Sequence, residues 1–193
     1  MIWIKAVFPS DGHIELPVSL SMSSAGTEQG LVRSMFTNIL LPLDGSDASF
    51  SAVRQGIALA TSLKSRLTAL VITVPWAAYF AREFAVVVPD VVVPQSEYDR
   101  KSATRAAGIL QSVEMEARKA DVTLNAVHRS HQSPHSAIVE EAAKQGCDLI
   151  VMASHHQPGF TGALLGSETM AVLSRTNIPV LVYRHNSSAQ APQ

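Results

Sequence analysis

Short apolar runs and longer segments with helical spacing alternate along most of the chain. The apolar runs are rich in β-branched residues, which favours strands. The predicted strands are residues 38–44, 66–74, 121–129, 147–154 and 178–184. The fourth of these, CDLIVMAS, is apolar at five consecutive central positions, which is typical of a strand buried on both faces of a parallel sheet.

Helices are predicted between the strands from capping residues and apolar periodicity. Ser46 is a suitable N-cap for the first helix, whose apolar face carries Phe50, Val53, Ile57 and Ala60. This helix follows directly on the first strand, as expected of a β-α-β unit.

The other helices have their own start signals. A Ser-Glu-Tyr-Asp sequence at 96–99 resembles a capping box and predicts a helix to about residue 119. Ser133 and Pro134 predict a third helix that ends at Gly146. Its inward residues are expected to be Ile138, Val139, Ala142 and Ala143. Residues 167–175 form a short fourth helix in this interpretation.

Residues 75–95 show no regular pattern. Their valine triplets, AVVVPDVVV, are strand-like, but the prolines argue for a surface excursion or an edge strand. The pattern does not choose between packing and a surface that faces a partner.

The alternation predicts the α/β class: a single-domain three-layer sandwich with a five-stranded, mainly parallel sheet and helices on both faces. The expected domain covers residues 35–185. Residues 1–34 lack periodicity and are expected to be a disordered extension or the product of an upstream start codon, and residues 186–193 a flexible tail. In parallel sheets, ligands bind at the carboxyl ends of the strands, near the switch in strand order.

Composition and charge restrict the expected partners and location of the protein. The chain has 193 residues, a net charge of −1 and one cysteine, so we expect neither a nucleic-acid partner nor a disulfide framework. Its apolar runs are shorter than the ~20 residues that span a bilayer, and its N-terminus lacks the apolar core of a signal peptide. These features predict a cytoplasmic protein without a membrane partner.

The segment ASHHQPGFTGALLGSET, residues 153–169, is the main candidate for chemistry. The first backbone N–H groups of a helix that begins at Ser167 have no partner within the helix, and its dipole favours an anion there. His131 and His135 are four residues apart, but His131 is expected in a loop and His135 in the first turn of a helix, so they do not form a pair on one helix face and we do not expect a metal site. Cys147 precedes a buried strand and is expected to be a small buried thiol.

Two parts of the chain resemble the universal stress protein family, of the adenine-nucleotide alpha-hydrolase-like superfamily. MFTNILLPLDGSDASFSAVRQGIALA is similar to the family's start, where the first strand ends in Pro-x-Asp-Gly-Ser. SPHSAIVEEAAKQGCDLIVMASHH and LLGSETMAVLSRTNIPVLVYR are similar to its last third. The family's nucleotide loop reads Gly, two residues, Gly, nine residues, then Gly-Ser or Gly-Thr. Here Ala153, His156 and Gly166-Ser167 hold those positions with the spacing intact.

The resemblance implies a nucleotide site and a homodimer. The residues implied at the site are Asp44, Gly45, Ser46, Val74, Ala153, Ser154, His155, His156, Gly166, Ser167, Glu168 and Thr169. Asp44 matches the position that contacts the nucleoside, although an Asp-Gly-Ser turn would also account for it. Val74 matches a position whose backbone meets the adenine. The family commonly dimerises through the last strand, here Ile178 to Arg184.

The function implied is that of a non-enzymatic stress-response regulator that binds ATP with Mg²⁺. His156 leaves two outcomes open, because its ring either blocks the pocket or donates a hydrogen bond to a phosphate. The alternatives are an adaptor of the same fold without nucleotide, or a weak ATPase. Adenylating enzymes usually carry an S-G-G-x-D-S loop or a His-x-Gly-His motif, and a hydrolase triad a G-x-S-x-G motif; none of these is present.

Overall fold

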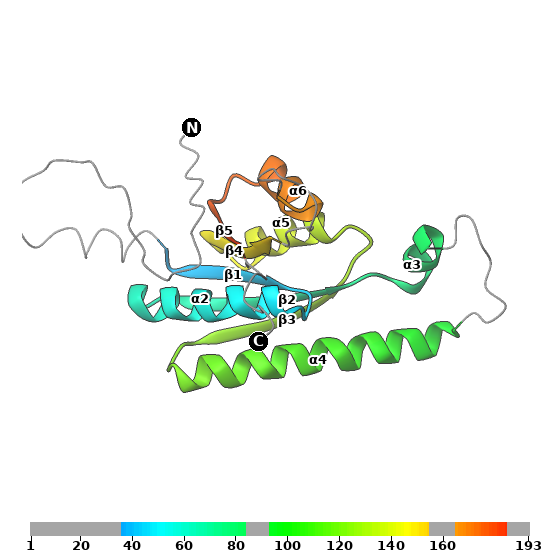
Figure 1. Ribbon diagram of the computed structural model, residues 1–193, viewed down its shortest axis with the longest axis horizontal. Coiled ribbons are helices and arrows are strands. Elements are labelled where there is room, and N and C mark those ends of the chain that lie inside the picture. The colour runs from blue at the N-terminus through cyan, green and yellow to red at the C-terminus, as the bar shows by residue number, and fades with distance from the viewer. Residues whose placement is uncertain (1–35, 84–92, 155–164, 185–193) are drawn as a thin grey trace, which may run out of the picture.

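The computed structural model describes residues 36–83, 93–154 and 165–184. Within these ranges five parallel strands form one sheet in the order β3-β2-β1-β4-β5 (Figure 1). The strands are β1 (Asn38–Leu43), β2 (Arg66–Thr73), β3 (Leu124–Ser130), β4 (Leu149–Ser154) and β5 (Val180–Arg184). This arrangement confirms the predicted α/β class, with a sheet that is parallel throughout.

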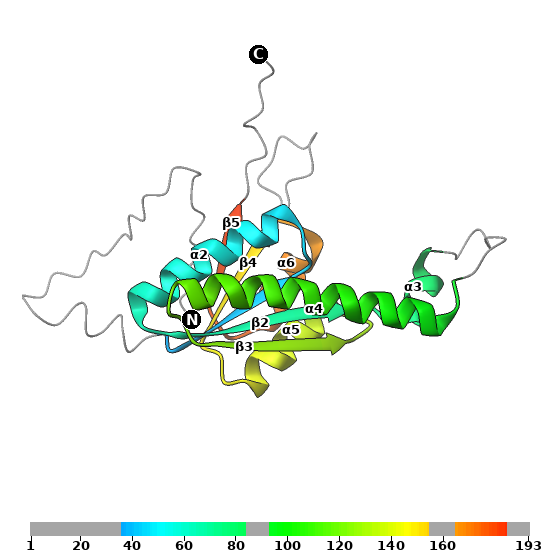
Figure 2. The same cartoon turned by 90° about the horizontal axis from the view of Figure 1, so that it is seen from below.

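Helices cover both faces of the sheet, as Figure 1 shows. α2 (Asp47–Leu63) and α4 (Gln95–Lys119) lie on one face, and α5 (Pro134–Lys144) and α6 (Ser167–Arg175) lie on the other. α3 (Trp76–Glu83) lies beside the amino-terminal end of α4, beyond the strands (Figure 2). No helix in the described ranges is both long and apolar enough to cross a membrane.

Each face of the sheet has its own apolar core. Alternate residues of β1 point to opposite sides, so that Ile39 and Leu41 pack under α2 and α4, while Leu40 packs under α5 and α6. All three are at most 1% exposed. The predicted burial of the fourth strand is confirmed, because Ile150 and Val151 belong to different cores.

The strand order places a switch point between β1 and β4. From β1 the chain proceeds outward through β2 to β3, then returns to β4 on the other side of β1. Connections on the two sides of such a point diverge, and the gap between the carboxyl ends of the strands is where ligands bind in these sheets. The fold therefore directs attention to the segments that follow β1 and β4.

Two predictions between β2 and β3 are wrong. Residues 76–83, predicted to be irregular, form α3, in which alanines favour a helix that starts directly after Pro75. The capping box at Ser96 does not form, since α4 begins at Gln95 with Pro94 as N-cap. The Pro94 carbonyl accepts from the backbone N–H groups of Glu97 and Tyr98, both at 3.0 Å, which closes the first turn. The valine triplets, apart from Val93, lie outside the described residues.

Several element boundaries also differ from the prediction. β3 begins at Leu124 rather than at Asp121, because Asp121 has a φ of 55° and forms the turn that follows α4. β4 begins at Leu149, because Cys147 still donates its N–H to Ala142 at 2.8 Å to close α5.

The ends of α5 and β5 are corrected in the same way. α5 stops at Lys144, before Gly146, and Ala143 is exposed rather than inward. β5 begins at Val180 rather than at Ile178, since Pro179 lacks the N–H needed to join the ladder.

Candidate functional site

Three predicted site segments lie at the carboxyl edge of the sheet, around the switch point. Asp44, Gly45 and Ser46 follow β1, Ala153 and Ser154 end β4, and residues 166–169 open α6. β1 and β4 are neighbours in the sheet, so segments separated by more than a hundred residues share one edge. His155 and His156 lie outside the described residues.

The turn after β1 is built by local hydrogen bonds. Asp44 Oδ1 accepts from the Ser46 N–H at 2.9 Å and from Ser46 Oγ at 2.6 Å, so Asp44 has the turn-forming role weighed from the sequence. Ser46 is the N-cap of α2, as predicted, and Ser46 Oγ accepts from the Ser49 N–H at 3.2 Å. Arg105 of α4 also donates to the Asp44 carbonyl at 3.1 Å.

Glycine is required at the centre of this turn. Gly45 has a φ of +81°, a conformation that disfavours residues with a side chain. A Cβ added at Gly45 would lie 2.6 Å from Ile109 Cδ1. α4 therefore packs directly against the backbone of the β1–α2 turn.

The start of α6 is tied to the end of β4. The Gly166 N–H donates to Ser154 Oγ at 3.1 Å, so the two ends of the predicted nucleotide loop meet. Gly166 is the N-cap of α6 and, as a glycine, has no side chain with which to cap the helix. Ser167 is exposed, whereas Thr169 is 3% exposed and supports the helix from within.

The carboxylate of Glu168 is bound to α5. Glu168 Oε2 lies 3.0 Å from both the backbone nitrogen and Nδ1 of His135, at the amino end of α5. His135 Nε2 in turn lies 3.0 Å from Ser133 Oγ. The first turn of α6 is thus linked to the first turn of α5.

Val74 lies next to a pocket at the carboxyl ends of β2 and β3. The pocket has a volume of about 410 Å³, and its lining includes Val74, Trp76, Tyr98 and His128. Tyr98 donates its hydroxyl to the Val74 carbonyl at 2.9 Å. A carbonyl oxygen has two lone pairs, so this backbone group can still accept from a ligand.

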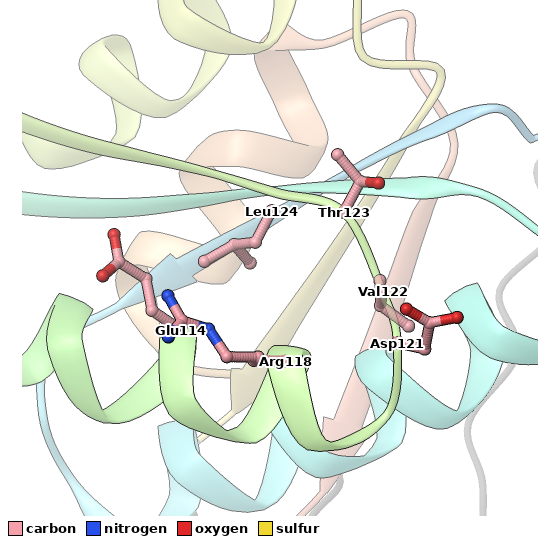
Figure 3. A pocket seen from close by; sticks show the side chains of 6 residues that line it. All are labelled: Glu114, Arg118, Asp121, Val122, Thr123 and Leu124. Carbon is pink, nitrogen blue, oxygen red and sulfur yellow. The ribbon is translucent and has the colours of Figure 1, made fainter.

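A second pocket, of about 390 Å³, lies at the opposite edge of the sheet (Figure 3). Glu114 and Arg118 of α4 line it together with residues 121–124, which lead into β3. It lies at the amino end of β3, whereas the predicted site residues lie at carboxyl ends of strands. This pocket is therefore separate from the candidate site.

Cys147 is buried, as predicted, and burial raises the pKa of its thiol despite a hydrogen bond to Thr68. The described residues contain no group of three or more histidine, cysteine or acidic side chains placed to hold a metal ion.

The sequence did not predict the contacts that side chains of α4 and α5 make at the site. Arg105 is 61 residues from Asp44, and His135 is 33 residues from Glu168. No local motif marks either of them. Tyr98 belongs to the capping-box-like sequence at 96–99, and its contact with Val74 depends on how α4 crosses the sheet.

The sequence profile of the Universal stress protein family matches residues 35–184. The chain belongs to the universal stress protein family. Universal stress protein YxiE of Bacillus subtilis is 27% identical over 157 residues, which cover 78% of this chain and all of that relative. Universal stress protein MJ0577 of Methanocaldococcus jannaschii is 42% identical over 55 residues, but these cover only 34% of its length.

Solved universal stress proteins share the fold. The structure of MJ0577 superposes with a TM-score of 0.64 at 25% identity, covering 80% of this chain and 99% of that one. A universal stress protein solved in complex with cAMP has a TM-score of 0.56 at 21% identity, covering 79% of this chain and 99% of that one. One from Archaeoglobus fulgidus, solved in complex with dAMP, has a TM-score of 0.53 at 17% identity, covering 77% of this chain and 98% of that one.

Proposed function

We propose that this universal stress protein binds ATP with Mg²⁺ at the carboxyl edge of its sheet and acts as a regulator rather than as an enzyme. The observation that carries the proposal is the junction of Ser154 with Gly166, which brings the two ends of the nucleotide-loop sequence together beside the β1–α2 turn. The first turn of α6, in which Ser167 is exposed, then offers backbone N–H groups and Ser167 Oγ to a phosphate.

The nucleoside has a place on the same edge. In the proposal Asp44 contacts the ribose and the Val74 backbone meets the adenine, next to the pocket of about 410 Å³. Apolar and aromatic walls with a few fixed polar groups are typical of small-molecule sites. Relatives of this fold solved with cAMP and dAMP support an adenine nucleotide as the ligand class.

Thermal unfolding of the full chain with and without Mg-ATP tests the proposal. A ligand at about a hundred times its dissociation constant adds roughly 2.7 kcal/mol to the free energy of unfolding. For a domain of this size that corresponds to a rise of roughly 5–10 °C in Tm. An unchanged Tm at millimolar Mg-ATP, with Mg²⁺ alone as the control, would contradict it.

We also propose that two copies of the chain pair through β5. Among the described strands β5 is at the edge of the sheet and pairs with β4 alone, so its outer side is open to a second strand. Antiparallel pairing of β5 with its own copy would cover both edges at once and has the two-fold symmetry usual in dimers.

A nucleotide-free adaptor is the second candidate function. It is favoured by the departures from the glycine pattern, Ala153 and His156. In that case the dimer would form as proposed, but Mg-ATP would leave the Tm unchanged. Slow ATP hydrolysis is the third candidate, and release of phosphate from bound ATP would distinguish it.

A further inference from the structure

Glu168 caps a neighbouring helix instead of its own. It is the second residue of α6, yet its carboxylate accepts from the backbone N–H of His135 in the first turn of α5. Ser133, the N-cap of α5, makes no side-chain cap bond to that helix. The carboxylate of Glu168 therefore replaces the missing cap and lies where the positive end of the α5 dipole stabilises it.

The His135 ring holds the same oxygen from a second direction. Nδ1 lies 3.0 Å from Glu168 Oε2, and Nε2 lies 3.0 Å from Ser133 Oγ. The ring is thus fixed at both nitrogens between α5 and α6. With the backbone N–H, it gives Glu168 Oε2 two nitrogen contacts, both at 3.0 Å.

The position of this carboxylate matters because Glu168 directly follows Ser167. A phosphate bound at the first turn of α6 would meet a negative charge within a few ångströms if the Glu168 side chain turned toward it. Like charges at such a separation repel by an amount that lowers anion affinity measurably, even near the protein surface. An acidic residue here is compatible with a phosphate site only if its side chain is held elsewhere.

We propose that His135 is a positioning residue for nucleotide binding. It keeps the Glu168 carboxylate at the amino end of α5 and so keeps this charge away from the phosphates that the first turn of α6 would bind. The inference rests on the proposed function, because it assigns His135 a role at that same site.

The packing below the two helices makes the role of His135 separable from folding. Ile138 and Ala142 of α5 and Val172 of α6 belong to one buried core and are each at most 4% exposed. The helices are held together by this core, while the His135 and Glu168 side chains are 23% and 46% exposed above it. Removing the imidazole should therefore leave the carboxylate held by the backbone N–H of residue 135 alone, free to turn toward the site part of the time, without displacing α6.

The test is a set of calorimetric titrations of the full chain with ATP and with adenosine. His135→Ala should weaken ATP binding roughly three- to tenfold. Adenosine affinity should stay the same, since adenosine carries no charge to be repelled. His135→Gln, whose amide can still donate to Glu168, should recover most of the loss.

Glu168→Gln removes the charge and so isolates its effect. In the Glu168→Gln background, His135→Ala should no longer weaken ATP binding, and Glu168→Gln alone should bind ATP at least as tightly as the wild type. Equal ATP affinity of wild type and His135→Ala would overturn the inference, as would an equal loss in the presence and absence of the Glu168 charge. Failure of the wild type to bind ATP at all would instead overturn the proposed function, and the role of His135 with it.

Discussion

Ser167 is the residue on which the phosphate site depends most directly. It is the first residue of α6, is exposed, and follows the glycine that is tied to the end of β4. If its hydroxyl donates to a phosphate, Ser167→Ala should weaken ATP binding by about 1.5–3 kcal/mol, the value of a hydrogen bond to a charged group. Calorimetric titration of the variant measures this loss.

Ser174 provides the matched control for that change. It lies on the same helix, is exposed, and donates its hydroxyl to the Ala171 carbonyl at 2.9 Å, at the end remote from the site. Ser174→Ala should leave ATP affinity unchanged. A dissociation constant for Ser167→Ala equal to that of Ser174→Ala would exclude the proposed contact.

Glu141 is the most buried charge among the described residues. Its side chain is fully buried on α5, and Glu141 Oε2 accepts from Arg129 of β3 at 2.7 Å. Burial by itself raises the pKa of Glu141, but the hydrogen bond from Gln145 and the charges of Lys144 and Arg129 outweigh it, so the pKa lies below its ordinary value. The ion pair thus joins α5 to the sheet.

The lowered pKa of Glu141 predicts the direction of acid sensitivity. A carboxylate whose pKa is depressed on folding adds stability above its unfolded pKa, and that stability is lost as the pH falls through the folded value. Glu141→Gln should cost about 1.5–3 kcal/mol at neutral pH, because it removes the charged hydrogen-bond acceptor of Arg129 and leaves that side chain, which is 32% exposed, only the more distant Glu140 carboxylate at 3.9 Å. Urea unfolding should show this cost shrinking as the pH falls below the ordinary glutamate range.

Glu97 serves as the control for the acid effect. Its pKa is also lowered, chiefly by the hydrogen bond from Lys101, but the pair lies on the surface. Glu97→Gln should therefore change the urea midpoint little at any pH. A Glu141→Gln cost that stays constant from neutral to acidic pH would contradict the assigned charge interaction.

At the scale of elements, two helical glycines are predicted to respond in opposite directions to alanine. A Cβ at Gly56 of α2 would lie 2.5 Å from Leu41 Cδ2 in the buried core, whereas one at Gly108 of α4 meets nothing within 4 Å. Gly108→Ala should stabilise by about 0.5–1 kcal/mol through helix propensity. Gly56→Ala should destabilise by roughly 1–2 kcal/mol, because overpacking exceeds that gain.

Chemical denaturation of the two variants measures both the expected gain and the expected loss in the free energy of unfolding. A stabilising Gly56→Ala would mean that Leu41 moves aside without cost, and that β1 and α2 are less tightly packed than described. Gly108 is exposed, so its variant also measures the effect of helix propensity without a change in core packing.

The element order could be predicted from the sequence because buried apolar residues recur with the spacing of a strand or of a helix. β1 and β4 are apolar on both faces, and Ser46 caps α2 through a local bond that its own sequence dictates. The α3 helix could not be predicted because it is short, and the prolines and valines that follow it in the sequence obscure its helical spacing. The start of α4 was missed because Pro94, rather than Ser96, closes its first turn.

Some residues of the candidate site can likewise be predicted from their neighbours in the sequence, and others cannot. Asp44 and Ser167 lie in short motifs whose chemistry is readable from neighbouring residues. Arg105, Tyr98 and His135 reach the site from helices that are distant in sequence, so their contacts depend on how helices cross the sheet. Such contacts require the tertiary structure.

At the scale of the whole molecule, β5 presents backbone groups on its outer side. The Ile150 N–H donates to the Pro179 carbonyl at 3.0 Å, and Ile150 pairs in register with Val180. In a parallel ladder this pattern turns Leu181 toward β4 and directs the N–H groups of Val180 and Val182 outward. These are the groups that a second β5 strand would bind.

Val182→Pro is predicted to make the protein monomeric. Proline removes one outward N–H, and edge strands tolerate it when the missing N–H faces away from the sheet. Val182→Ala, which loses the buried side chain but keeps the N–H, should remain a dimer. Light scattering of wild type and both variants decides the matter, since a monomeric wild type or a dimeric Val182→Pro would contradict pairing through β5.

The central claim is that the carboxyl edge between β1 and β4 binds a nucleotide. Calorimetric titration of the full chain with Mg-ATP tests it most directly. The account predicts saturable binding of one nucleotide per chain. Absence of binding at millimolar Mg-ATP would contradict the account and leave the protein as an adaptor whose nucleotide loop is closed to its ligand.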